Sequence, residues 1–228
     1  MFLDYAVFKM RKLVFANGEI YHVFNQGVER RPTFIDKREY DRALLTLNYY
    51  RNAEITAGLA QILRLDQEKR DFLFSRLTDD KKLIEVLCYC FMPNHFHFLL
   101  KQLIDGGIQT FVSNFSNSYT RYFNTKRKRI GPLFQGAFKA VRIEDDEQLI
   151  HVSRYIHLNP VVSFLIKESD LENYPYCSFQ EYISSQGKIC NTSMVLNQFS
   201  SQDNYKNFVY DQIDYGKRLE FIKHLTFE

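Results

Sequence analysis

Four segments of the chain are rich in apolar, aromatic and β-branched residues or alternate between apolar and polar positions, as expected for β-strands. The four predicted strands are Glu19–Asn25, Leu83–Phe91, His95–Lys101 and Phe134–Ile143. Only Met92 to Asn94 separates the second strand from the third, and this link contains the turn-forming residues Pro93 and Asn94. The short link predicts that these two strands are antiparallel neighbours.

Helical spacing of apolar residues occupies the stretches between these strands. The predicted helices are Asp36–Arg51, Ile108–Asn124 and Asp145–Leu158, with a helical hairpin over Ala53–Asp80 and short helices near Met194–Gln198 and Tyr205–Tyr215. Asn159 and Pro160 are expected to stop the third of these helices, because proline cannot donate the hydrogen bond that continues a helix.

The predicted order is strand, helix, strand, strand, helix, strand, helix, which is the split βαβ arrangement of a ferredoxin-like fold. We therefore expect an α+β protein, with an antiparallel sheet, helices on one face and one further helix appended after the last strand. A length of 228 residues fits one core with a short extension.

The composition is that of an ordinary globular protein, with 45% apolar and 25% charged residues, and it is rich in Phe and Tyr. The net charge of +3 is mild, but cations are concentrated in the middle of the chain. These cations are Arg121, Lys126, Arg127, Lys128, Arg129, Lys139 and Arg142. Cations near aromatic rings suit a nucleic-acid partner, although core packing accounts for most of the rings.

The cysteines and the lengths of the apolar segments indicate the cellular compartment in which the protein is expected. The four cysteines lack the spacing of a disulfide scaffold or a CxxC zinc site, so we expect reduced thiols. Neither a signal peptide nor an apolar run of about 20 residues is present, which predicts a cytoplasmic protein with no membrane partner.

His95 and His97 are the first candidates for chemistry, because residues two apart on a strand project from the same face. Two imidazoles on one face can bind a single divalent ion, whereas Phe96 and Phe98 would point into the core. The spacing alone is equally compatible with two structural histidines.

A second group lies on the last predicted helix, where His151, Tyr155 and Asn159 recur at intervals of four and share one side. If this helix lies across the strand of His95 and His97, the two imidazoles and the Asn159 amide oxygen form a ligand set for Mg²⁺ or Mn²⁺. Such an ion would polarise a scissile phosphate. Tyr155 would then attack phosphorus, giving a phosphotyrosine and a free hydroxyl.

A tyrosine ester conserves the energy of the broken phosphodiester, so the strand can be rejoined to another end. A phenol has a pKa of about 10, so some group must favour the phenolate. The metal, His151 or a nearby cation are all candidates for that role.

Four segments, YHVFNQGVERRPTF, CYCFMPNHFHFLLK, SYTRYFNTKRKRIGPLFQGAFKA and LIHVSRYIHLNPV, resemble in order and spacing the IS200-like (Y1) tyrosine transposases. This family includes relatives associated with repetitive extragenic palindromes. The resemblance runs from about Tyr21 to Tyr182, so we expect a transposase domain over residues 1–182 and an extension of unknown role over 183–228.

The resemblance implies that His95 and His97 form the metal-binding His-hydrophobe-His motif, that Tyr155 is the nucleophile and that Asn159 completes the metal site. It further implies single-stranded DNA hairpins as substrate and a homodimer in which the tyrosine helix serves the partner's site. Relatives carry Arg where this chain has Gln26 and Ala137, which removes two potential phosphate contacts.

Three other hypotheses remain open from the sequence. The first is a domesticated module that binds DNA hairpins without cleaving them. A replication initiator or relaxase would use the same chemistry, but usually carries larger partner domains. The last is a structural protein that binds no metal.

Overall fold

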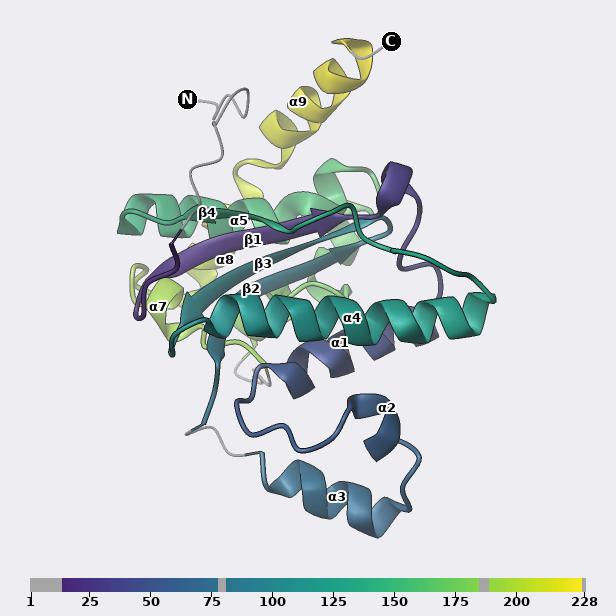
Figure 1. Ribbon diagram of the computed structural model, residues 1–228. Coiled ribbons are helices and arrows are strands. Elements are labelled where there is room, and N and C mark those ends of the chain that lie inside the picture. Colours follow the sequence, from purple (N-terminus) through teal and green to yellow (C-terminus); the bar gives the residue numbers. More distant parts are fainter. Residues whose placement is uncertain (1–13, 78–80, 185–188, 227–228) are drawn as a thin grey trace.

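A four-stranded antiparallel sheet with the strand order β2-β3-β1-β4 forms the centre of the computed structural model (Figure 1). The structure describes residues 14–77, 81–184 and 189–226, with side chains up to residue 220. The end of the predicted hairpin, residues 78–80, lies outside the described residues. The strands are β1 (Ile20–Gln26), β2 (Ile84–Met92), β3 (His95–Gln102) and β4 (Lys139–Arg142).

The sheet and its helices have the ferredoxin-like topology predicted from the sequence. The longer helices are α1 (Lys37–Tyr50), α3 (Gln67–Ser75), α4 (Gly107–Arg127), α5 (Asp146–Val162), α8 (Gln202–Tyr210) and α9 (Ile213–Thr226). Shorter ones are η1 (Val28–Arg30), α2 (Leu59–Ile62), η2 (Glu168–Asn173), α6 (Phe179–Ile183) and α7 (Ser193–Leu196). Helices α1 and α4 cover one face of the sheet, and α5 covers the other (Figure 1).

Each face of the sheet buries its own hydrophobic cluster. On the first face, aromatic side chains dominate, and Phe96 and Phe98 of β3 pack 5.3 Å from Phe115 of α4, measured between ring centroids. On the second face, Leu149 and Ile156 of α5 are buried. Because strand residues alternate between faces, every second residue of β3 lies under α5.

Helix α1 begins where the sequence predicts. The Asp36 side chain accepts a hydrogen bond from the Glu39 backbone N–H, and the Glu39 side chain accepts one from the Asp36 backbone N–H, which forms a capping box. The predicted hairpin after α1 is also present as α2 and α3, which extend beyond α1 on the side away from the sheet (Figure 1).

The last predicted strand is shorter than the alternation indicates. Only Lys139–Arg142 pairs with β1, and Phe134 contributes an isolated bridge to Gly27. Gly136, which has a φ of 57°, bends the chain between these two contacts. Positive φ is accessible to glycine at little cost, so the alternation persists in the sequence while the pairing is interrupted.

The prediction that α5 stops at Leu158 is wrong, because α5 continues through Pro160 to Val162. Proline inside a helix leaves the carbonyl four residues earlier without its donor, at a cost of about 3 kcal/mol. Here the Sγ of Cys177 lies 4.0 Å from that carbonyl, on Ile156. The extra turn buries Val161 beside Leu158 in the second cluster, which offsets this cost.

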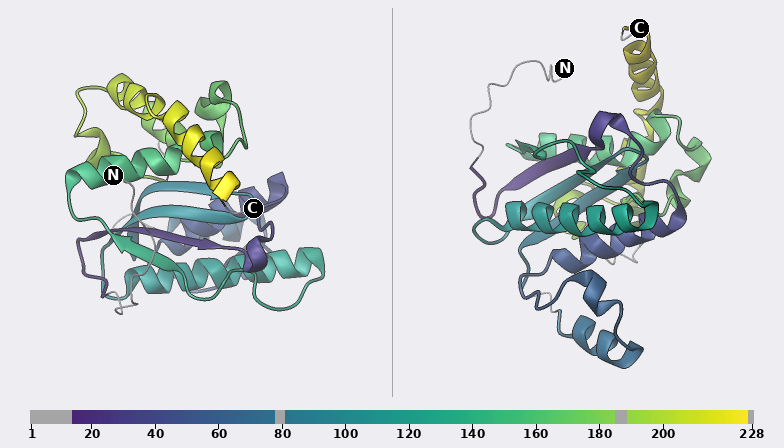
Figure 2. Two further views of the ribbon diagram at one scale, coloured as in Figure 1. Left: turned by 90° about the horizontal axis from the view of Figure 1, so that it is seen from above. Right: turned by 45° about the vertical axis from the view of Figure 1, so that its right-hand side comes forward.

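The C-terminal segments pack on α5 and enlarge the second cluster, to which Val195, Tyr205, Val209 and Ile213 contribute buried side chains. Helix α9 then projects from the α5 side of the molecule (Figure 2). The boundary at residue 182 stays a prediction. Among the helices that the structure describes, none has the length and apolar character needed to cross a bilayer.

Candidate active site on the α5 face of the sheet

His95 and His97 both lie on the face of β3 that α5 covers, as their spacing predicts. Phe96 and Phe98 between and after them are fully buried on the opposite face. The two imidazole rings are 4.9 Å apart between centroids and perpendicular to each other. The strand therefore holds two ring edges close together beneath α5.

Tyr155 of α5 lies directly beside these histidines. Its ring centroid is 5.4 Å from that of His97, and the two rings meet edge to face at 84°. Tyr155 is 47% exposed, whereas Ile156, the next residue along α5, is fully buried. The phenol thus packs on the histidines with one side of its ring while the rest remains in contact with solvent.

A third histidine, which no local sequence pattern indicates, completes the cluster. His22 of β1 is buried, and its Nε2 lies 2.9 Å from Nδ1 of His97. Its ring also packs edge to face with Tyr155 at a centroid distance of 6.0 Å. Phe24 of β1 is the direct partner of His97. His22 lies two residues before Phe24 on β1, so it projects from the same face of the sheet.

Burial keeps these imidazoles neutral. It lowers the pKa of His22 to about 4. Burial also lowers the pKa of His95 to about 4, against an opposing effect from the charge of Glu220 on α9. The pKa of His97 falls well below its ordinary value, again chiefly through burial. Neutral imidazole is the form that binds metal ions, so no proton has to leave these rings at neutral pH.

The hydrogen bonds of the two motif histidines leave the same nitrogen available on each. Nδ1 of His95 donates to the side-chain oxygen of Asn94 at 2.6 Å, and Nδ1 of His97 is engaged by His22. Neither Nε2 has a hydrogen-bond partner among the described residues. Neither of them belongs to the polar atoms that are fully buried and unpaired. Metal-binding histidines characteristically anchor one nitrogen and present the other, so the pair fits a divalent ion.

Asn159, the third predicted ligand, lies one turn beyond Tyr155 and is buried. Its Nδ2 donates to the Tyr155 backbone carbonyl at 2.8 Å, which leaves the side-chain oxygen without a hydrogen bond among the described residues. The part of the chain that the structure describes holds no cluster of three His, Cys, Asp or Glu side chains suited to a metal ion. A ligand set of two imidazoles and one amide oxygen stays a prediction.

His151 has other contacts, although it lies one turn before Tyr155 on α5. Its Nδ1 accepts a hydrogen bond from Arg154 at 2.7 Å, and its Nε2 lies 3.9 Å from a Glu147 oxygen. Its ring packs 5.6 Å from Phe208 of α8. These contacts make His151 a poor acceptor for the Tyr155 proton.

The cations predicted to bind DNA differ in their surroundings. Lys126 and Arg127 at the end of α4 form ion pairs with Asp36 and with Glu39, whose side chain is fully buried. This network joins the start of α1 to the end of α4, on the face of the sheet opposite His97. Lys126 and Arg127 therefore stabilise the packing of α1 on α4. The concentration of charge in the sequence does not indicate this role.

The other predicted cations divide in the same way. Arg129 donates to the side-chain oxygen of Asn124 and to the Pro132 carbonyl, and Arg142 pairs with Glu19 at 2.8 Å. Arg121, Lys128 and Lys139 form no ion pair within the described residues. The strand register places Lys139 on the α5 face, because Phe24 is the direct partner of both Lys139 and His97.

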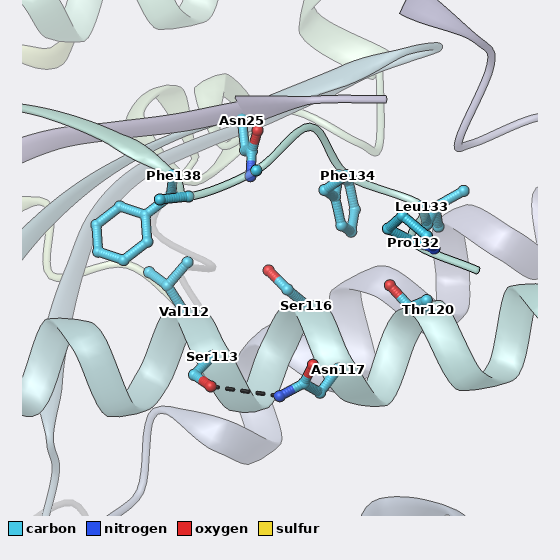
Figure 3. Close-up of a pocket in the computed structure, with 12 residues that line it drawn as sticks. Asn25, Val112, Ser113, Ser116, Asn117, Thr120, Pro132, Leu133, Phe134 and Phe138 are labelled. Atoms are coloured by element: carbon cyan, nitrogen blue, oxygen red, sulfur yellow. Dashed lines mark hydrogen bonds between the residues drawn. The ribbon is translucent and has the colours of Figure 1, made fainter. Parts of the chain in front are cut away.

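A groove of about 350 Å³ lies on the opposite side of the sheet, between α4 and the segment before β4. Ser116 and Thr120 of α4 face Asn25, Phe134 and Phe138 across it (Figure 3). The residues that line this groove include no titratable side chain, so it lacks the groups needed for acid–base catalysis.

Comparison with known proteins gives a family match over part of the chain. Residues 61–159 match the sequence model of the family described as "Transposase IS200 like", and this segment contains His95, His97, Tyr155 and Asn159. This part of the chain is similar to the IS200-like transposases. This confirms the resemblance drawn from the sequence. No curated protein matches the chain.

Two solved structures resemble this chain. A REP-associated tyrosine transposase bound to a REP hairpin is 14% identical, with a TM-score of 0.50 over 80% of this chain and 90% of that one. A candidate transposase from Deinococcus radiodurans R1 is 15% identical, with a TM-score of 0.35 over 66% of this chain and 95% of that one. The first likeness supports the ferredoxin-like fold.

Proposed function

We propose that this IS200-like protein cleaves single-stranded DNA and transfers the cut strand, with Tyr155 as the nucleophile. The observation that carries the proposal is the contact between Tyr155 and His97, 5.4 Å between ring centroids, beside two imidazoles whose Nε2 atoms are unengaged. A nucleophile next to two neutral metal ligands is the arrangement that metal-assisted phosphoryl transfer requires.

His95 and His97 would hold a divalent ion such as Mg²⁺ or Mn²⁺, with Asn159 as the third protein ligand. The ion supplies charge neutralisation at the scissile phosphate when bound. Tyr155 gives up its phenolic proton as its oxygen bonds to phosphorus, the bond to one bridging oxygen breaks, and that oxygen takes up a proton and leaves as a hydroxyl. The resulting ester can be attacked by another DNA hydroxyl, which restores a phosphodiester and frees the phenol.

We propose DNA hairpins as the substrate, because the chain carries the segments of the transposase family and folds like a protein described with a REP hairpin. Lys139, on the same face as His97, is positioned to contact the backbone of a strand entering the site. The hairpin itself would be held by phosphate contacts from cations such as Arg121 and Lys128.

The proposed nucleophile and the proposed histidine ligands lie side by side within one chain. Tyr155 packs on His22 and His97 of its own chain. We therefore propose that the homodimer implied by the family resemblance, if it forms, is not needed to bring nucleophile and histidines together.

The test uses end-labelled single-stranded hairpins from the DNA that flanks the gene, incubated with purified protein and Mn²⁺ or Mg²⁺. We expect a protein–DNA adduct that resists denaturation and is lost in Tyr155→Phe and on removal of the metal with EDTA. Tyr215→Phe is the matched control, because Tyr215 is 49% exposed and Tyr155 is 47% exposed. An adduct that persists in Tyr155→Phe contradicts the proposal, and hairpin binding without any adduct indicates the domesticated module instead.

A further inference from the structure

His22 and His97 share one hydrogen bond between two buried rings. The 2.9 Å separation between His22 Nε2 and His97 Nδ1 requires that one nitrogen donates and the other accepts. A neutral imidazole carries a single N–H, so the direction of this bond fixes which nitrogen of His97 bears the proton. The bond therefore decides whether His97 Nε2 is a lone pair or an N–H.

Only one direction is compatible with a cation at His97. If His97 Nδ1 donates to His22, the Nε2 of His97 is a lone pair that can bind a metal ion. If His22 donates instead, His97 Nε2 carries a proton and points an N–H toward the ion. His95 has the first arrangement, because the Asn94 side-chain oxygen can only accept from its Nδ1.

We propose that His22 is a positioning residue, which accepts the Nδ1 proton of His97 and so holds the His97 Nε2 lone pair toward a divalent ion. His22 is suited to this role because it comes from the neighbouring strand and is only 4% exposed, which fixes its ring. Ring contacts to Phe24 at 5.1 Å and to Tyr155 at 6.0 Å restrict it further. This inference rests on the metal-dependent function proposed above.

The first experiment measures Mn²⁺ affinity of the whole protein by calorimetry. Loss of an outer hydrogen bond to a metal-binding histidine costs roughly 10- to 100-fold in affinity, which we expect for His22→Phe, where the ring remains but the acceptor is gone. His22→Gln restores an acceptor near the position of Nε2, so its affinity should lie within a few-fold of wild type. His157→Gln removes a buried histidine from the second cluster and should bind Mn²⁺ like wild type.

The second experiment needs neither metal nor DNA. Long-range proton–nitrogen NMR on ¹⁵N-histidine protein reports which ring nitrogen of His97 carries the proton. We expect Nδ1–H in wild type and in His22→Gln, and a shift toward Nε2–H in His22→Phe. An Nε2–H tautomer in the wild type overturns the inference, whatever the state of the metal site.

The outcomes separate this inference from the proposed function. Equal Mn²⁺ affinity in wild type and a folded His22→Phe variant overturns the role of His22 and leaves the metal-dependent function standing. A wild-type protein that binds no divalent ion and forms no adduct overturns both. Tenfold or greater loss in His22→Phe, recovery in His22→Gln and the Nδ1–H tautomer together support the inference.

Discussion

The hydrogen-bonded side chain of His157 on α5 should make the stability of the protein depend on pH, through a single buried ring. His157 is fully buried, with Nδ1 2.7 Å from the Tyr205 hydroxyl and Nε2 2.8 Å from the Ser178 hydroxyl. Ser178 itself donates to the Tyr89 carbonyl, so it accepts from His157 Nε2–H, and Tyr205 donates to Nδ1. The ring thus joins α5 to α8 and β2 as a neutral group.

Burial lowers the pKa of His157 from about 6.5 to about 3. Below about pH 6.5 the unfolded chain therefore takes up a proton that the folded protein excludes, and stability falls as the pH drops. With these two pKa values, the loss between about pH 7.5 and about pH 5.5 is about 1.4 kcal/mol. The loss would end only near the folded pKa.

The assay compares wild type with His157→Gln by urea unfolding at several pH values. Glutamine can accept from Tyr205 and donate to Ser178 but does not titrate, so the variant should cost about 1–2 kcal/mol near pH 7.5. As the pH falls to about 5.5, the wild type should lose about 1.4 kcal/mol more than the variant. His22 and His95 titrate in both proteins and cancel in the difference. If the free energy of unfolding changed equally with pH in the two proteins, the prediction would be wrong.

Three further predictions concern other parts of the molecule. Glu39→Gln removes the buried charge that pairs with two cations of α4, and it should destabilise the protein by about 2 kcal/mol in urea unfolding. Gly216→Ala places a Cβ 2.6 Å from Val162 Cγ1, so it should speed amide exchange in α9, and Val162→Ala in the same chain should reverse this. Lys139→Ala should weaken binding of a single-stranded hairpin and reduce its salt slope by about one, whereas Arg142→Ala, on the opposite face, should change neither.

Local pattern predicted the elements well, because alternation and helical spacing depend on neighbouring residues. His95 and His97 were found in this way, since their shared face follows from the geometry of a single strand. His22 was not found, because it joins them through pairing between strands 75 residues apart in the sequence. The register of β1 against β3 decides that contact, and no local pattern encodes the register.

Two other differences also have long-range causes. Helix α5 passes through Pro160 because packing of Leu158 and Val161 outweighs a local penalty that the sequence rules apply correctly. Lys126, in the basic run, is tied to carboxylates about ninety residues earlier in the chain. In each case tertiary contacts outweigh a local preference that would otherwise decide the structure.

The central claim is that Tyr155 is the residue that becomes joined to DNA. Trypsin digestion of the adduct, followed by mass spectrometry, tests it directly, because cleavage after Arg154 gives a peptide that begins with Tyr155 and contains no other tyrosine. We predict that this peptide, residues 155–167, carries the nucleotide on its tyrosine. Attachment of the nucleotide to any other residue would contradict the claim.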